Sequence, residues 1–237
     1  MCHRSRLYGH NPPYDHPVNP ADLIARHPSV FHTADARAWP SIQANGLMPA
    51  SMLLEACGAQ ASPRPRQRRT TSQLLTMTDR ADHTVVVRDQ LPLKFLDRVL
   101  EKGTSREEFL ETLDERCFFW ASEHRLLRLL RGRMYRKTPQ VVLTVDTATL
   151  VDAYGDKIEL SPYNSGSAHV PTAPKRGKET FQPIDRYDYD GWRRARGKSG
   201  DAVVEVTILG PVPDIMNHVT AVRHFPGADF EPRDSEK

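Results

Sequence analysis

Short segments rich in β-branched and aromatic residues are spread along this chain, and helical segments fall between them without regular alternation. The strand-like segments are residues 29–33, 84–88, 116–120, 140–146, 157–160, 202–209 and 219–225. Helix-end signals and periodicity favour helices over residues 36–45, 51–57, 91–100, 105–114 and 122–134. Because strands and helices do not alternate, a doubly wound parallel sheet is disfavoured, and we expect a single mixed α+β domain.

The composition agrees with a folded domain. The 237 residues include 38% hydrophobic ones, which suffices for a core. No stretch approaches the roughly 18 to 20 apolar residues of a membrane span, and the N-terminus has no apolar signal core. We therefore expect a cytoplasmic protein with no membrane partner. The domain is expected over residues 20–226, after an irregular Pro-rich arm (1–19) and before a disordered tail (227–237).

Common cofactor motifs are missing from the sequence. Cys2, Cys57 and Cys117 are too few and too scattered for a disulfide framework, and no paired Cys or His spacing predicts a metal site. Gly-x-Gly-x-x-Gly does not occur, and the Gly-Lys-Ser of residues 197–199 lacks the P-loop spacing. Any dinucleotide would therefore bind on a fold other than the Rossmann fold.

Two segments far apart in the chain place polar residues in apolar strands. Phe31-His32-Thr33 precedes a helix that ends at Gly46, and Glu205 lies in the apolar run 203–208. Both residues could line a ligand site. Alternation in the run also fits a Glu205 that faces water, and His32 fits a structural histidine equally well.

Three further motifs have both a functional and a structural interpretation. Arg88 could bind a pyrophosphate or could pair with Asp89 at the surface. The Phe-Phe-Trp run 118–120 could cover a cationic ring, although core packing is the commoner role of such residues. Asn164 begins an Asn-Ser-Gly motif that could face a ligand or form an ordinary turn.

Arginines are bunched although the net charge is only +3. They gather in residues 64–69, 125–136 and 192–196, the last with Trp192. Such runs are usually solvated faces, but together they could line a nucleic-acid channel in which Trp192 stacks on a base.

The motifs resemble the split active site of the DarT-type, poly(ADP-ribose)polymerase-like branch of NAD-dependent ADP-ribosyltransferases. His32-Thr33 and the Ile-x-x-x-Gly-Leu of residues 42–47 are similar to that branch's opening strand and helix. Residues 116–120 resemble its aromatic central strand, and Glu205 resembles its late glutamate. The chain also resembles an uncharacterised bacterial family with His-Thr, Val-x-Arg-Asp-Gln-x-Pro-Leu, Phe-Phe-Trp and Asn-Ser-Gly motifs. The resemblance covers about residues 28–224 in short motifs.

The resemblance implies a split, antiparallel-rich central sheet flanked by helices, and an enzyme that transfers ADP-ribose from NAD with release of nicotinamide. Cleavage of the nicotinamide–ribose bond passes through an oxocarbenium-like state, which a carboxylate stabilises. Glu205 and His32 would be catalytic, with His32 donating a hydrogen bond to the adenosine ribose. The residues expected to bind NAD are His32, Thr33, Gly46, Arg88, Phe118, Phe119, Trp120 and Asn164.

Several alternatives stay open. The acceptor could be nucleic acid, as for DarT-type enzymes, or a protein or small molecule. An RNA 2'-phosphotransferase-like enzyme would use the same fold with several arginines around a phosphate. A non-catalytic binding module, the toxin or defence partner of a neighbouring gene product, would keep the fold without turnover.

Overall fold

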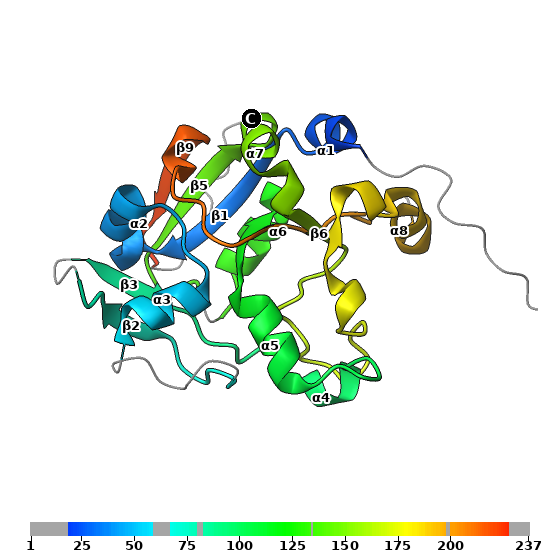
Figure 1. Cartoon of the computed structure of the whole chain (residues 1–237), viewed down its shortest axis with the longest axis horizontal. Helices are drawn as coiled ribbons and strands as arrows, with labels where there is room; N and C mark the ends of the chain where they lie inside the picture. Colours follow the sequence, from blue (N-terminus) through cyan, green and yellow to red (C-terminus); the bar gives the residue numbers. More distant parts are fainter. Residues whose placement is uncertain (1–18, 59–66, 80–82, 134, 198–199, 228–237) are drawn as a thin grey trace, which may run out of the picture.

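The computed structural model describes residues 19–58, 67–79, 83–133, 135–197 and 200–227. Its main sheet has seven strands in the order β7-β6-β8-β4-β1-β5-β9, and all neighbouring strands are antiparallel. Figure 1 shows β9, β5 and β1 side by side. The expected mixed α+β domain with an antiparallel-rich sheet is thus confirmed. The strands are β1 (Ser29–Asp35), β4 (Arg116–Trp120), β5 (Gln140–Asp146), β6 (Ile158–Ser161), β7 (Gln182–Pro183), β8 (Glu205–Leu209) and β9 (Val219–Phe225).

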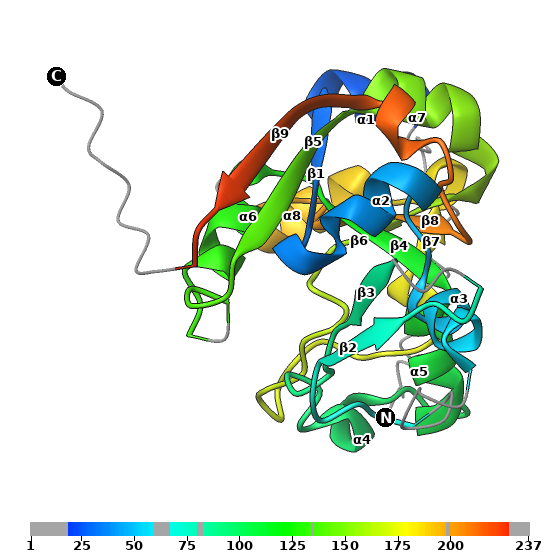
Figure 2. The same ribbon diagram turned by 90° about the vertical axis from the view of Figure 1, so that its left-hand side faces the viewer.

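A second, two-stranded sheet lies beside the main one. It pairs β2 (Gln73–Thr76) with β3 (Thr84–Val87) and lies next to helices α3 (Ala50–Ala56) and α5 (Arg106–Asp114) in Figure 2. Leu75, Val85 and Val87 form a small core with Leu54 of α3. This small core is separate from the main core cluster, which contains Phe119 of β4.

Helices cover both faces of the main sheet, so its central strands are buried on both sides. Val30, Phe119 and Val206 belong to the larger core on one face. Phe31 and Val142 pack against helix α6 on the other face. The remaining helices are α1 (Pro20–Arg26), α2 (Trp39–Asn45), α4 (Leu96–Val99), α6 (Glu123–Leu130), α7 (Thr147–Tyr154) and α8 (Tyr189–Arg196).

The predicted strand, helix and Gly stop near the start of the chain are confirmed. Asp35 ends β1 and accepts a hydrogen bond from the Arg37 backbone N–H (3.0 Å), which opens a short 3-10 turn before α2. Gly46 ends α2 at a φ of 75°. A Cβ atom there would lie 2.4 Å from Pro213 Cα, so both the backbone angle and the close packing require glycine.

Two predicted helices are shorter than expected. Only Leu96–Val99 is α-helical within residues 91–100. Backbone groups before this turn bond elsewhere: the Gln90 N–H donates to Arg69 O, and the Phe95 N–H donates to Ala168 O. Tertiary contacts thus replace the intrahelical ladder. Helix α6 ends at Leu130, two residues before Gly132, rather than at residue 134.

Helices α7 and α8 and strands β2 and β7 were not predicted. An aspartate caps each helix: Asp146 accepts from the Thr149 N–H (2.8 Å) and Asp188 from the Gly191 N–H (2.8 Å). The expected arm and tail lie outside the described residues, apart from Asn19 and Gly227. No helix of the described segments is long and apolar enough to cross a lipid bilayer.

Candidate functional site

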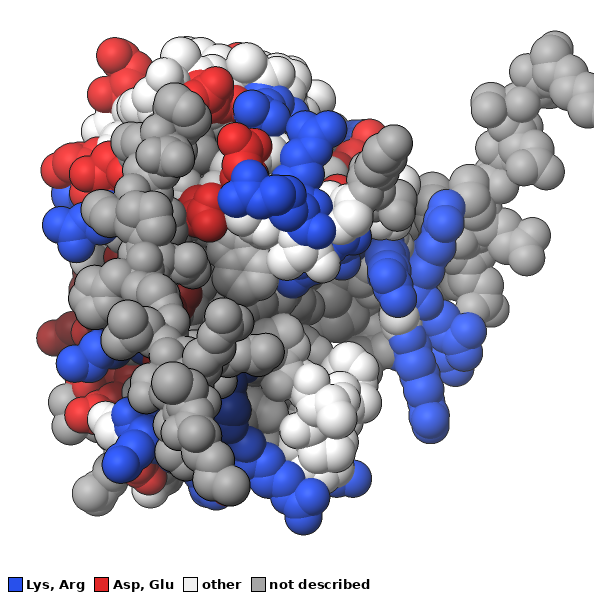
Figure 3. All heavy atoms as spheres, turned by 90° about the vertical axis from the view of Figure 1, so that its right-hand side faces the viewer, with Lys and Arg blue, Asp and Glu red and all other residues white. Residues whose placement is uncertain are grey.

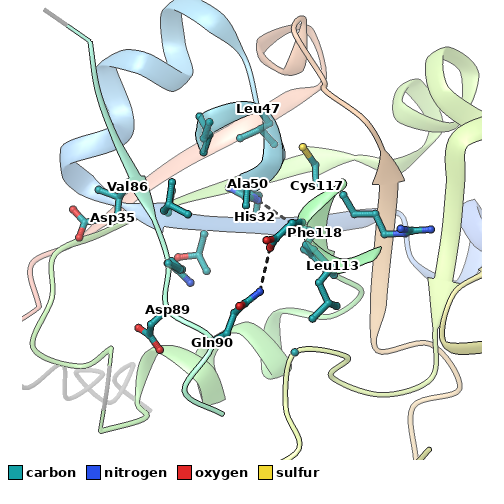
Figure 4. Close-up of a pocket in the computed structure, with 18 of the residues that line it drawn as sticks. His32, Asp35, Leu47, Ala50, Val86, Asp89, Gln90, Leu113, Cys117 and Phe118 are labelled. Atoms are coloured by element: carbon teal, nitrogen blue, oxygen red, sulfur yellow. Dashed lines mark hydrogen bonds between the residues drawn. The ribbon is translucent and has the colours of Figure 1, made fainter. Parts of the chain in front are cut away.

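A cavity of about 680 Å³ lies between the main sheet and strand β3 of the smaller sheet. Figure 4 shows Asp89 and Gln90 on one side of it and Leu47 on the opposite side. Its volume falls in the range of cofactor and ligand sites. All nine predicted site residues contribute to its lining: His32, Thr33, Gly46, Arg88, Phe118, Phe119, Trp120, Asn164 and Glu205.

Glu205 does not face water. Its strand lies between β4 and β6 in the sheet, and the residue is only 5% exposed. The alternative of a solvent-facing glutamate is therefore wrong. Alternation of polar and apolar residues indicates a solvated face only when one face of the strand is free, and β8 is covered on both.

One oxygen of the Glu205 carboxylate is held by Ser165. Oε2 accepts hydrogen bonds from the Ser165 backbone N–H (3.1 Å) and hydroxyl (2.6 Å). Burial raises the pKa of Glu205 to about 7, although the Ser165 hydrogen bonds and the positive charge of Arg176 act in the opposite direction. Oε1 accepts no hydrogen bond from the described part of the chain. The Asn-Ser-Gly motif thus positions the carboxylate.

His32 is neutral at pH 7. Its Nδ1 donates a hydrogen bond to the Phe118 carbonyl oxygen (2.9 Å; Figure 4), and because a carbonyl only accepts, Nδ1 carries the proton. Burial, followed by the nearby charge of Arg88, lowers the pKa of His32 to about 4. Nε2 therefore presents a lone pair. This corrects the expectation that His32 donates to a ligand hydroxyl, since its free nitrogen can only accept.

The cavity lies where two central strands stop pairing. Strands β1 and β4 are paired only at Phe31 and Trp120. Paired residues lie on the same face of a sheet, and successive residues of a strand lie on opposite faces. Trp120 and Glu205 therefore lie on the face of Phe31, and His32 lies on the other face. The His32 imidazole nevertheless reaches across to the backbone of β4. His32 and Glu205 thus line one cavity without a direct hydrogen bond.

The three aromatic residues of β4 have different surroundings. Trp120 is half-buried and lies directly opposite Glu205 in the ladder. Phe118 packs edge-on against Phe181, with ring centroids 6.0 Å apart. Phe119 is 1% exposed and belongs to the main core, as the structural interpretation predicted. Trp120 is therefore the best placed of the three to cover a ligand ring beside Glu205.

Arg88 does not form the predicted surface pair with Asp89. Its Nη2 donates to Gln140 Oε1 (2.5 Å), and its guanidinium lies 5.0 Å from the centre of the Tyr135 ring. Asp89 instead accepts from the Ser72 hydroxyl (2.8 Å). Among the described residues no carboxylate forms an ion pair with Arg88. Burial lowers the pKa of Arg88, whereas the nearby charges of Asp35 and Asp89 act in the opposite direction.

Two other arginines of the cavity wall are already paired. Arg69 forms two hydrogen bonds with Asp114 (2.6 and 2.7 Å), and both side chains are buried. Arg116 binds Glu159 (2.6 and 2.8 Å). Arg69 was expected in a solvated basic run, so its buried ion pair is a correction. Arg64 and Arg66 of that run lie outside the described residues.

The other basic segments are exposed in part. Arg125 pairs with Asp201 (2.6 Å), whereas Arg193 and Arg194 of α8 are exposed. Figure 3 views the side of the molecule on which α8 lies and shows Lys and Arg side chains gathered there. Trp192 contacts Tyr163 edge-on at 6.4 Å, next to the Asn164 turn. These contacts bring α8 beside the loop that holds Glu205.

Comparison with known families identifies the family of the chain. It belongs to a family of unknown function (DUF7002), whose model matches residues 28–219. The match includes every predicted site residue, from His32 to Glu205. No curated protein matches the chain.

Proposed function

We propose that this protein is an NAD-dependent ADP-ribosyltransferase that releases nicotinamide and transfers ADP-ribose to an acceptor. The observation that carries the proposal is the buried Glu205 carboxylate in the cavity wall. One of its oxygens is held by Ser165, the other is free of protein hydrogen bonds among the described residues, and Trp120 lies opposite. A buried carboxylate costs stability, so its presence in a cavity points to chemistry.

Glu205 would act on the positive charge that develops at the ribose. As the nicotinamide–ribose bond breaks, its electron pair leaves with the nicotinamide nitrogen, and C1' of the ribose becomes cationic. A carboxylate in a low-dielectric site stabilises this charge strongly. The positive pyridinium of bound NAD would also lower the pKa of Glu205 and favour its ionised form. The acceptor then forms the new bond to C1', and its proton passes to the Glu205 carboxylate or to water.

The other cavity residues fit the remaining parts of NAD. The Nε2 lone pair of His32 would accept a hydrogen bond from a ribose hydroxyl, and Arg88 would bind the pyrophosphate. The face of Trp120 would cover the nicotinamide ring. Thr33 and Gly46 line the same wall, and Asn164 lies beside Ser165.

The arginine contacts favour this reaction over RNA 2'-phosphotransfer. That reaction needs several arginines around a phosphate, whereas Arg69 and Arg116 are already bound to Asp114 and Glu159. Arg88 alone among the described arginines of the cavity wall has no carboxylate partner. One arginine can bind the pyrophosphate of NAD, but it cannot supply the several positive charges that a transferred phosphate needs.

The test is to incubate the protein with NAD labelled in both the nicotinamide and the adenine, with and without single-stranded DNA or RNA as acceptor. The expected result is release of labelled nicotinamide by the wild type, and a rate of release at least about a hundredfold lower in Glu205→Gln. Adenine label on the nucleic acid would identify it as the acceptor. No release by the wild type would leave the binding module as the better explanation, and processing of a 2'-phosphorylated RNA would favour the phosphotransferase.

A further inference from the structure

We propose that Arg176 is a positioning residue that fixes the loop of residues 164–167, so that Ser165 holds the Glu205 carboxylate. Its bearing on catalysis rests on the proposed function, but its effect on Glu205 does not. Arg176 was not among the residues that the sequence pointed to. It lies outside every motif, in a Pro, Lys and Arg-containing stretch without periodicity.

The Arg176 guanidinium is buried and donates hydrogen bonds to five backbone carbonyl oxygens. Arg176 as a whole is only 1% exposed. On one side it donates to Asn164 O (3.1 Å), Ser165 O (3.1 Å) and Ser167 O (2.7 Å). On the other it donates to Pro174 O (2.6 Å) and Lys175 O (3.3 Å). A loop whose carbonyls converge on one cation is held in one conformation.

Arg176 is itself fixed independently of this loop. Its backbone N–H donates to Val99 O (2.8 Å), and its carbonyl accepts from the Glu101 N–H (2.8 Å). Its guanidinium also lies 4.2 Å from the centre of the Tyr163 ring. The described part of the chain provides no carboxylate that pairs with it. A buried arginine that forms no ion pair is costly, so its role is to organise the loop.

The loop determines how Glu205 is presented. Ser165 is fully buried, and both of its donors point to the same carboxylate oxygen. In the sheet, Glu205 lies between Ser161 on β6 and Trp120 on β4, neither of which titrates near neutral pH. Arg176 is the cation that acts on the carboxyl. Loss of the loop's conformation would remove both Ser165 hydrogen bonds. The ionised form of Glu205 would then be less stable, and its pKa would rise.

The experiment measures the pKa of Glu205 by carbon NMR of its carboxyl group, assigned with Glu205→Gln, in the wild type, Arg176→Lys, Ser165→Ala and the double variant. Lysine keeps the positive charge but cannot bridge the carbonyls of both segments. We expect Ser165→Ala, which removes one of the two hydrogen bonds, to raise the pKa of Glu205 by about 1. Arg176→Lys should raise it by at least as much, and the double variant should add little to Arg176→Lys. Unchanged pKa in Arg176→Lys, or additive effects in the double variant, would overturn the inference.

Arg116→Lys is the matched control, because Arg116 is a half-buried arginine that also lies beside an aromatic ring but binds Glu159 rather than the loop. It should leave the pKa of Glu205 unchanged. If Arg176→Lys does not fold, Tyr163→Leu removes the ring beside the guanidinium and should give a smaller rise in the same pKa; no rise would contradict the inference. Since no NAD is used, a failure of nicotinamide release would refute the proposed function without affecting this result.

Discussion

Replacing Glu205 by glutamine should change the pH dependence of stability in a way that the structure determines. The pKa of Glu205 is about 7 in the folded protein, compared with 4.5 for an ordinary glutamate. Below pH 4.5 both folded and unfolded chains carry the proton. As the pH rises from 4.5 to 7 the unfolded chain loses it first, so the free energy of unfolding falls. The full loss above pH 7 is about 3 kcal/mol, from 1.36 kcal/mol for each pKa unit.

The Glu205→Gln variant carries no such penalty because its amide does not titrate. The variant's own hydrogen bonding to Ser165 is the same at every pH. The pH-dependent part of the difference in unfolding free energy between the two proteins therefore comes from Glu205 alone. For a chain of this length a difference of about 3 kcal/mol corresponds to roughly 6 to 12 °C in Tm. Relative to the wild type, the variant should therefore gain that much in Tm between pH 4 and pH 8.

The assay is thermal unfolding of both proteins at several pH values, followed by circular dichroism. Glu115→Gln is the control, because Glu115 is exposed at the end of α5 and should show no pH-dependent difference. Parallel Tm profiles for wild type and Glu205→Gln would refute the burial argument. Together with a loss of nicotinamide release, the expected result would show that Glu205 is kept at the expense of stability.

Three further predictions concern neighbouring groups. Saturating NAD should raise the Tm of the wild type, and His32→Ala should reduce that rise. An equal rise in both proteins would show that His32 does not bind NAD. Arg69→Met leaves the buried Asp114 charge unpaired and should lower the free energy of unfolding in urea by about 3 to 5 kcal/mol, whereas a loss below 1 kcal/mol would mean that the pair is solvated. Burial raises the pKa of Cys117 to about 12, so a thiol reagent should label it only after unfolding, and labelling located at Cys117 in the native protein would contradict its burial.

Local signals in the sequence were enough to predict the parts of the fold that depend on neighbouring residues. Strands β4 and β5 have the predicted bounds, and the Ser105 cap of α5 forms a capping box with Glu108. The Gly46 stop is also correct. Each of these depends on residues within a few positions of one another, so one sequence contains the necessary information.

The parts that sequence reasoning missed depend on distant segments. Glu205 is buried because β4 and β6 lie on either side of its strand, and no pattern within residues 203–208 reveals those neighbours. Ser165 belongs to a motif for which a ligand-facing role and an ordinary turn both stayed open, and its bond to Glu205 joins residues 40 positions apart. Arg176 acts through carbonyl oxygens, which every residue has, and therefore leaves no compositional signal.

The cavity has walls that belong to two different sheets. One wall is the central sheet, while the other includes β3, whose buried Val85 and Val87 belong to the small core and whose Val86 packs against the main one. Local opening of a protein follows such divisions, since a unit with few buried contacts separates at a lower free energy than the whole chain unfolds. The β2–β3 unit should therefore open at a lower free energy than β4 and β8, which have a paired strand on each side. Amide hydrogens of β2 and β3 would then exchange with solvent well ahead of those flanking Glu205.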